Sequence, residues 1–249
     1  AGRRILASKQ RPDAVFAARK GLRLAVGAAL ADGLEATYGA MASTGSFAPD
    51  AGSAGRRALR NLCLDYLAVS GSDAGIGRAR AQFDSADNMT DRMMALAVLT
   101  QHDRPERTAA LEAFYATFEK DALVIDKWFT IQAQIPEAGT LDRVRGLMAH
   151  PAFSMGNPNR VRSLVGAFAA SNPTQFNRKD GAGHAFLADV VLGLDAKNPQ
   201  VASRLLSAFK TWRQLEPVRR ANAEAALKRV ATTPGLSADV ADIAARSLA

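Results

Sequence analysis

The chain has 249 residues, of which 48% are apolar and 22% charged, and its formal net charge at pH 7 is +8. A chain of this length and apolar content can bury a sizeable core, which excludes global disorder. The apolar run from Leu24 to Leu30 is far shorter than the roughly 20 residues that a membrane-spanning helix needs, so no association with a membrane is expected.

The N-terminus and the cysteine content bear on the compartment. Ala1 to Leu6 include basic residues but no apolar run of signal-peptide length, and the absence of an initiator Met indicates a fragment or a processed product. The single cysteine, Cys63, excludes an internal disulfide framework and fits a reducing compartment. We therefore expect a cytoplasmic protein.

The positive charge is concentrated in the first third of the chain. Residues 1–80 hold 12 Lys or Arg against 6 Asp or Glu, whereas residues 81–249 hold 20 against 18. A nucleic-acid groove would interleave such charge with exposed aromatic rings. Helical spacing instead places most aromatics of this region toward a core; they are Phe16, Tyr38, Phe47 and Tyr66. The charge is better explained by a solvated surface, or by a face that meets an acidic neighbouring domain, and nucleic acid is not an expected partner.

Apolar residues in the first half recur with helical spacing. One stripe, with intervals of three, four or seven residues, predicts one long helix or two joined helices; its members are Val15, Leu22, Val26, Leu30, Leu34, Tyr38 and Met41. Residues 43–55, rich in Ser, Gly and Ala, are expected to interrupt it. A second helix follows with Leu59, Leu62, Tyr66 and Leu67 on one face, and Gly71 is expected to end it. Shorter helical faces follow around Phe114, Trp128 and Val144.

Two Asn-Pro pairs predict helix starts in the second half. Asn157-Pro158 and Asn198-Pro199 each place a capping amide before a proline at the first helical position, where the missing N–H has no cost. Between them, residues 186–194 are more continuously apolar, which is typical of a helix buried on two sides. Pro217 and Ser237 are expected to start two further helices, and no alternating strand pattern is visible.

Short successive helices joined by short loops are typical of a bundle or of a solenoid. No predicted helix is long enough to organise a four-helix core for 249 residues. We therefore predict an all-α fold, an α-solenoid of stacked antiparallel helix pairs, with residues 1–249 as a single helical-repeat domain.

The sequence holds no evident catalytic or metal site. His102, His150 and His184 are too far apart for any pair to show the i, i+4 spacing that places two imidazoles on one zinc ion. Cys63 lies on a core-facing helix, which favours a buried apolar role over that of a nucleophile. We expect no catalytic residue and no metal in this chain.

Arginines near the Asn-Pro caps form the polar cluster that indicates binding. Arg162 follows Pro158, Arg204 follows Pro199, and together they could attract a carboxylate if the two helices meet. Arg160 and Arg162 are two residues apart and point in directions about 200° apart, so only one of them shares a face with a given partner. The alternative is that these arginines are solvated or form structural ion pairs.

Several longer segments carry a family resemblance. They are Arg57-Ala-Leu-Arg-Asn-Leu-Cys-Leu64, Asn88-Met-Thr-Asp91, Asp126-Lys-Trp-Phe129, Asn157-Pro-Asn-Arg-Val-Arg-Ser-Leu-Val-Gly-Ala-Phe168, Asp180-Gly-Ala-Gly-His-Ala-Phe-Leu187 and Asn198-Pro-Gln-Val-Ala-Ser-Arg-Leu205. In this order they resemble the C-terminal domain of a bacterial aminopeptidase N. The resemblance extends over nearly the whole chain and is weakest in residues 1–55.

The resemblance implies a zinc-dependent peptidase that removes N-terminal residues from peptides. The zinc ion and its His-Glu-x-x-His helix would lie in a separate catalytic domain of the same polypeptide, absent here. This chain would be its armadillo-like or HEAT-like cap, which gates access of short peptides to the active-site cavity. Arg162 and Arg204 match positions that face this cavity, with Asn157, Asn159 and His184 as neighbours. His184 stands where the family pattern leads us to expect Tyr.

A second hypothesis is an independent helical-repeat scaffold that binds protein or nucleic acid. An upstream reading frame continuous with Ala1 that encodes His-Glu-x-x-His and a downstream Glu would distinguish the two. The first hypothesis also leaves the preferred N-terminal residue of the substrate to the absent catalytic domain.

Overall fold

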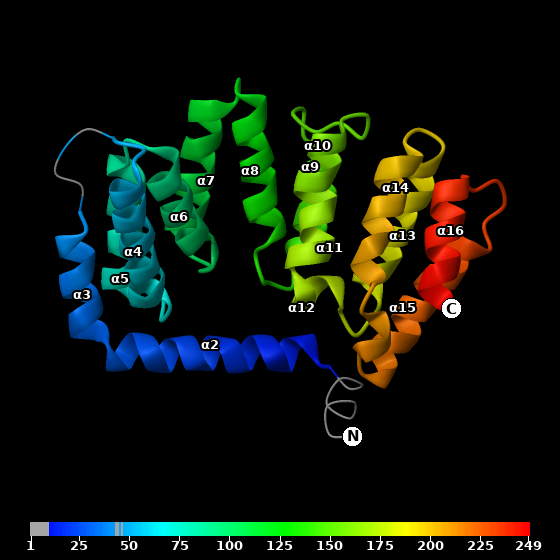
Figure 1. The fold of residues 1–249 in the computed structure, drawn as a ribbon, viewed down its shortest axis with the longest axis horizontal. Coiled ribbons are helices and arrows are strands. Elements are labelled where there is room, and N and C mark those ends of the chain that lie inside the picture. The colour runs from blue at the N-terminus through cyan, green and yellow to red at the C-terminus, as the bar shows by residue number, and fades with distance from the viewer. Residues whose placement is uncertain (1–9, 43–44, 46) are drawn as a thin grey trace. The chain divides into compact units, whose positions relative to one another are not determined.

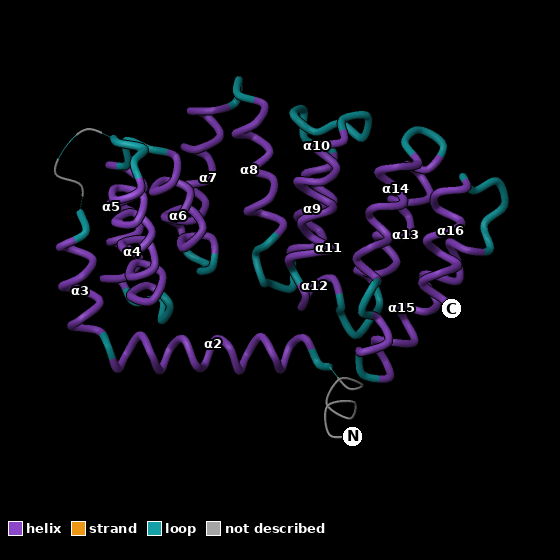
Figure 2. The backbone as a smooth tube through the Cα atoms, in the orientation of Figure 1, coloured by secondary structure: helices purple, strands orange, loops and turns teal. Residues whose placement is uncertain are grey.

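The computed structural model describes residues 10–42, 45 and 47–249. Residues 1–9, which include Ala1 to Leu6, and residues 43, 44 and 46 of the predicted interruption lie outside the described residues. Where the chain is described it is helical, apart from its loops and one isolated parallel bridge between Gln10 and Leu215 (Figure 2). The predicted all-α class is thus confirmed. Across the described residues, no helix has both the length and the apolar character that crossing a membrane requires.

The chain forms two compact units. The described residues between 17 and 118 form the N-terminal unit, and residues 10–16 together with residues 119–249 form the C-terminal unit. Helix α2 (Pro12–Ala29) therefore begins in the C-terminal unit and ends in the N-terminal unit. Both units are built from stacked antiparallel helix pairs, so the predicted solenoid architecture is confirmed.

The N-terminal unit is formed by successive helices, of which α3 packs on α4 and α5 on α6 (Figure 1). After α2 they are α3 (Ala31–Ala40), α4 (Ala51–Ala68), α5 (Asp73–Ser85), α6 (Met89–Thr100) and α7 (Pro105–Phe118). The first predicted stripe proves to be two joined helices that meet at Leu30. Gly71 follows α4 in the left-handed conformation, with φ 72°. The end that we predicted for this helix is therefore confirmed.

The predicted interruption at 43–55 is too long. Helix α4 already begins at Ala51, because the Asp50 carboxylate accepts a hydrogen bond from the backbone N–H of Ser53 at 3.0 Å. An N-cap of this kind stabilises a helix by about 1 kcal/mol, enough to offset the weak helix propensity of a residue such as Gly52.

The apolar stripe of α2 is helical as predicted, but much of it is exposed. The side chains of Leu22 and Leu30 are 67% and 56% exposed, and Leu62 on α4 is 50% exposed. The buried residue of α2 is Gly27, where an added Cβ would lie 2.8 Å from the backbone oxygen of Tyr66 on α4. Helix α2 thus contacts α4 through a glycine and leaves Leu22 in solvent.

The C-terminal unit is likewise formed by successive helices (Figure 1). They are α8 (Ala122–Ala133), α9 (Thr140–Met148), α10 (Pro158–Val161), the π-helical turn η1 (Arg162–Gly166), α11 (Ala167–Ser171), α12 (Pro173–Phe176), α13 (Ala182–Asp195), α14 (Pro199–Leu206), the 3₁₀ turns η2 (Ser207–Phe209) and η3 (Trp212–Gln214), α15 (Pro217–Ala231) and α16 (Ala238–Leu248). The predicted helix starts at Pro158, Pro199, Pro217 and after Ser237 are all confirmed. Helix α13 packs between α14 and α15 and is buried on both sides, as predicted.

The first described residues of the chain are attached to the loop before α15. The N–H of Gln10 donates to the backbone oxygen of Gln214 at 2.7 Å, and the N–H of Glu216 donates to the oxygen of Gln10 at 3.0 Å. Arg219, which is buried, places its guanidinium 3.2 Å from the carboxylate of Asp13 and 3.0 Å from that of Glu216. Residues about 200 positions apart in sequence thus belong to one packed unit.

Candidate functional site

Both Asn-Pro pairs cap helices in the predicted way. The side-chain oxygen of Asn157 accepts from the backbone N–H of Asn159 at 2.9 Å, and that of Asn198 accepts from the N–H of Val201 at 3.1 Å. The continuous helical segment α10–η1–α11 and helix α14 therefore start where the sequence predicts.

The two helical segments meet, which the sequence could not show. Turn η1 contacts α14, and Gly166 lies at the contact. A Cβ added to Gly166 would lie 3.8 Å from the Cβ of Arg162 and 3.8 Å from a Cδ of Leu205. Arg162 and Arg204, the residue before Leu205, are both exposed. The structure thus brings the two predicted arginines to neighbouring elements at the surface.

Neither of these arginines is neutralised. The guanidinium of Arg162 donates to the side-chain oxygen of Asn159, an uncharged group. Over the residues that the structure describes, no carboxylate pairs with Arg162, and Arg204 has neither an ion pair nor a hydrogen bond through its side chain. Two exposed guanidinium groups without an acidic partner can receive an external anion, and their planar geometry suits a carboxylate.

Arg160 forms a structural ion pair, which was the alternative to a binding role for the arginines near the Asn-Pro caps. Its side chain is 9% exposed and forms an ion pair with Asp126 on α8. It also donates to the backbone oxygens of Ala122 and Ala152, each at 2.8 Å. Arg160 and Arg162 therefore point to different surroundings, as their two-residue spacing predicts.

His184 does not join the exposed arginines. Its side chain is 1% exposed and lies against the rings of Phe176 and Phe209, with centroid distances of 5.0 and 5.6 Å. Its Nε2 lies 3.1 Å from the side-chain oxygen of Asn177. Burial, with a smaller contribution from the positive charge of Arg219, lowers the pKa of His184 from 6.5 to about 4. The imidazole is therefore neutral at pH 7 and helps to form the core.

We expect this histidine to make the folded state sensitive to acid. In the unfolded chain His184 titrates near 6.5, so between pH 6.5 and 4 the unfolded chain binds a proton that the folded state does not. The free energy of unfolding is then highest above pH 6.5 and falls by about 3 kcal/mol as the pH drops to 4. Urea unfolding at pH 7, 5.5 and 4 measures this. The variant His184→Gln should lose this part of the pH dependence, and identical slopes for both proteins would assign the effect to other groups.

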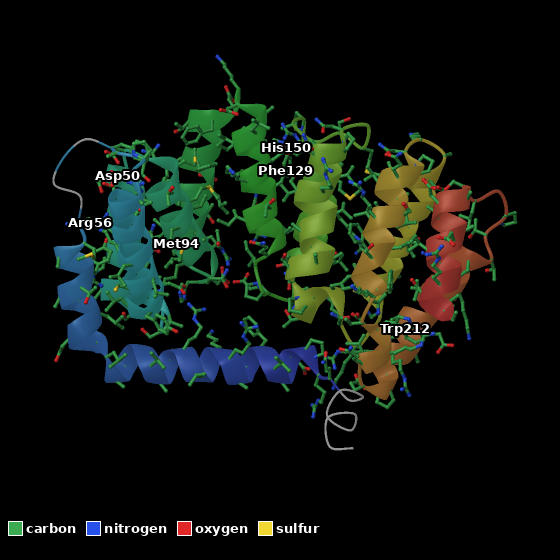
Figure 3. The ribbon with its side chains drawn as sticks, in the orientation of Figure 1. Asp50, Arg56, Met94, Phe129, His150 and Trp212 are labelled. Atoms are coloured by element: carbon green, nitrogen blue, oxygen red, sulfur yellow. The ribbon has the colours of Figure 1, made fainter. Side chains whose placement is uncertain are left out.

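The remaining histidines and the cysteine are placed in packing roles. Figure 3 shows His150 beside Phe129, and the two ring centroids are 5.9 Å apart. Burial lowers the pKa of both His102 and His150, and it raises the pKa of the Cys63 thiol. Cys63 is thus the buried apolar residue that we predicted. Within the described part of the chain, no group of three or more His, Cys, Asp or Glu side chains could hold a metal ion.

Sequence reasoning missed the π-turn that carries Arg162. In η1 the N–H of Ala167 donates to the backbone oxygen of Arg162, five residues earlier. Single π-turns within α-helices are often found at functional sites. The sequence contains no local signal for this turn, because the groups that contact it lie on α8.

Known proteins resemble this chain over nearly its whole length. A family model described as a domain of unknown function (DUF3458_C) with ARM repeats matches residues 3–249. Aminopeptidase N from Caulobacter vibrioides is 40% identical over 237 residues, which are 95% of this chain and 28% of that protein. Aminopeptidase N from Escherichia coli is 37% identical over 238 residues, which are 96% of this chain and 27% of that protein.

A solved structure shows the same fold. The crystal structure of Legionella pneumophila aminopeptidase A in complex with aspartic acid matches this chain with a TM-score of 0.88 and 28% sequence identity. The match covers 97% of this chain and 29% of that one, so the chain spans less than a third of the length of these relatives. The chain belongs to the DUF3458_C family of ARM-repeat domains and is similar over nearly its whole length to the C-terminal domain of bacterial aminopeptidase N.

Proposed function

We propose that this chain is the non-catalytic cap of a zinc-dependent aminopeptidase, and that Arg162 and Arg204 hold the C-terminal carboxylate of a short peptide substrate. The observation that carries the proposal is the meeting of η1 and α14, which places two exposed arginines without an acidic partner on adjacent elements. A cap of this kind limits substrate size, excludes bulk water and orients the peptide from the end far from the reacting bond.

The chemistry of the two arginines suits this role. A guanidinium group offers parallel N–H donors that match both oxygens of a carboxylate. Asn159 holds the guanidinium of Arg162 without neutralising it, and the Asn157 cap fixes the start of the same helical segment. The Legionella pneumophila relative was solved with aspartic acid, a small molecule that carries carboxylates.

Two observations support a catalytic domain in the same polypeptide as the partner. The curated relatives are more than three times as long as the part that this chain matches. The N-terminal unit also leaves large apolar side chains exposed, notably Leu22, Leu30 and Leu62, and a neighbouring catalytic domain would cover them. Zinc and the hydrolytic chemistry would belong to that domain, and the parent enzyme would act on peptides in the cytoplasm.

The proposal also treats residues 1–249 as one helical-repeat domain in the parent protein. One family model runs without interruption from residue 3 to residue 249 and so includes both compact units. This continuous match supports the treatment of both units as parts of one domain.

The test uses the full-length protein and three substrates: a tripeptide with a free C-terminus, the same tripeptide amidated, and a small arylamide. Arg162→Ala and Arg204→Ala are each expected to lower kcat/KM for tripeptides with a free C-terminus. Converted to activation free energy, the loss should be about 1–3 kcal/mol, because each variant removes a charge-assisted hydrogen bond. A small arylamide lacks the carboxylate, so its kcat/KM should change little. Amidating the tripeptide should cause most of the same loss in the unmutated enzyme. It should cause little further loss in either variant, since amidation and mutation remove the same interaction.

Arg220→Ala is the matched control. Arg220 is an exposed arginine of the same unit and lies on α15. Its substitution should leave the ratio of peptide to arylamide activity unchanged. Equal losses for both substrates in the Arg162 and Arg204 variants would indicate a damaged fold. Unchanged activity toward both substrates would reduce these arginines to solvated surface charges and refute the proposal.

A further inference from the structure

The helical segment that bears Arg162 contains one irregular turn. Residues 158–171 form a continuous helical segment in which η1 interrupts α10 and α11 with a π-helical hydrogen bond from Ala167 to Arg162. A π-turn contains more residues than an α-turn, so it changes the direction of the side chains that it carries. Such a turn persists where neighbouring groups stabilise the altered backbone.

Helix α8 supplies those groups. The hydroxyl of Thr130 lies 3.0 Å from the backbone oxygen of Ser163 and 2.9 Å from that of Asp126, so its single proton is shared between the two. The hydroxyl of Ser163 in turn lies 3.1 Å from the carboxylate of Asp126. Ser163 is the residue after Arg162, so α8 holds the π-turn at its second position through both backbone and side chain.

The other side of the same turn borders α14. The Cβ of Arg162 and a Cδ of Leu205 each lie 3.8 Å from the place that a Cβ on Gly166 would take. A shift of the turn along or about its axis would therefore change where Arg162 leaves the helix relative to Arg204. The hydrogen bonds from α8 and the glycine contact to α14 together determine the position of Arg162.

We propose that Thr130 is a positioning residue for Arg162: its hydrogen bond to Ser163 stabilises the π-turn and directs Arg162 toward the peptide carboxylate. This inference rests on the proposed function of Arg162. Asp126 contributes to the same arrangement but also holds the buried Arg160, so its substitution would not isolate the effect.

The experiment compares three variants of the full-length protein. Thr130→Val keeps the shape of the side chain and removes the hydroxyl, and we expect it to lower kcat/KM for free-carboxylate tripeptides roughly 3- to 10-fold, with little change for the arylamide. Thr130→Ser restores the hydroxyl and should recover most of the activity. Thr232→Val is the matched control, because Thr232 bonds to backbone oxygens of its own helical segment without reaching another element.

A double-mutant cycle separates positioning from general stability. In the Arg162→Ala background, Thr130→Val should have no further effect on peptide activity, because the residue through which it acts is gone. An equal loss in both backgrounds, or an equal loss for arylamide and peptide, would overturn the inference and leave Thr130 with a structural role. If Arg162→Ala changes peptide activity and Thr130→Val does not, the inference alone fails. If Arg162→Ala has no effect, the proposed function fails with it.

Discussion

Gly183→Ala is expected to lower the free energy of unfolding by about 3 kcal/mol or more. Gly183 lies in the first turn of α13, where an added Cβ would be 2.3 Å from the backbone oxygen of Phe176 and 2.6 Å from that of Gln175. Both obstacles are main-chain atoms of α12, so a change of side-chain rotamer cannot relieve the clash. Helix α12 or α13 must move, and the ring of His184 would move with it.

Gly193→Ala in the same helix is the control for this prediction. No atom of the described residues lies within 4 Å of the Cβ that this substitution would add, apart from the helix itself and the adjacent residues. Alanine should stabilise α13 here by about 0.5–1 kcal/mol, because it restricts the unfolded chain more than glycine does. Thermal and urea unfolding of the two variants should give changes of opposite sign. A Gly183→Ala protein as stable as the parent would show that α12 and α13 can separate enough to admit a methyl group at little cost.

Arg160→Ala should have a comparable effect on stability for an electrostatic reason. The substitution removes the ion pair with Asp126 and leaves the oxygens of Ala122 and Ala152 without their donor. Removing one member of a buried pair leaves a charge with poor hydration, which typically costs 3–5 kcal/mol; the loss is expected at about 3 kcal/mol, since Asp126 is partly exposed. Urea unfolding at pH 7 provides the measurement.

Arg162→Ala, two residues further along, is the internal control. Its guanidinium is exposed and bonds to a neighbouring asparagine, so its loss should change stability by less than about 0.5 kcal/mol. Adding Asp126→Asn to Arg160→Ala should recover part of the lost stability, because the unpaired charge is then removed. Destabilisation by Arg162→Ala equal to that by Arg160→Ala would contradict the assignment of one arginine to structure and the other to function.

Features determined within one helical turn were predictable from the sequence. The Asn157-Pro158 and Asn198-Pro199 starts and the left-handed Gly71 each depend on a few adjacent residues, and all three are confirmed. The exposure of Leu22 and Leu30 was not predictable, because helical spacing identifies an apolar face without identifying what covers it. Among the described residues, nothing covers these two side chains.

The residues of the candidate site could be predicted from the sequence, but their proximity in the fold could not. Arg162 and Arg204 could be named from their positions after the proline caps, whereas the contact of η1 with α14 depends on packing across Gly166. Local spacing carries no information on the π-turn, since Thr130 contacts it from 33 residues away. The burial of His184 depends in the same way on rings from other elements, such as Phe209.

The attachment of Gln10 to the loop before α15 affects the order in which the chain can fold. Residues 17–118 leave the ribosome as one continuous unit and can fold from local contacts, but Asp13 has no partner until Arg219 has been synthesised. Closing a flexible loop of this length costs roughly 5 kcal/mol in chain entropy, and prior folding of residues 17–118 lowers that cost by removing about half of the flexible chain. The segment around Asp13 is thus synthesised before residues 17–118 but reaches its native place after them, and release of a chain truncated before Arg219 would leave it without this partner.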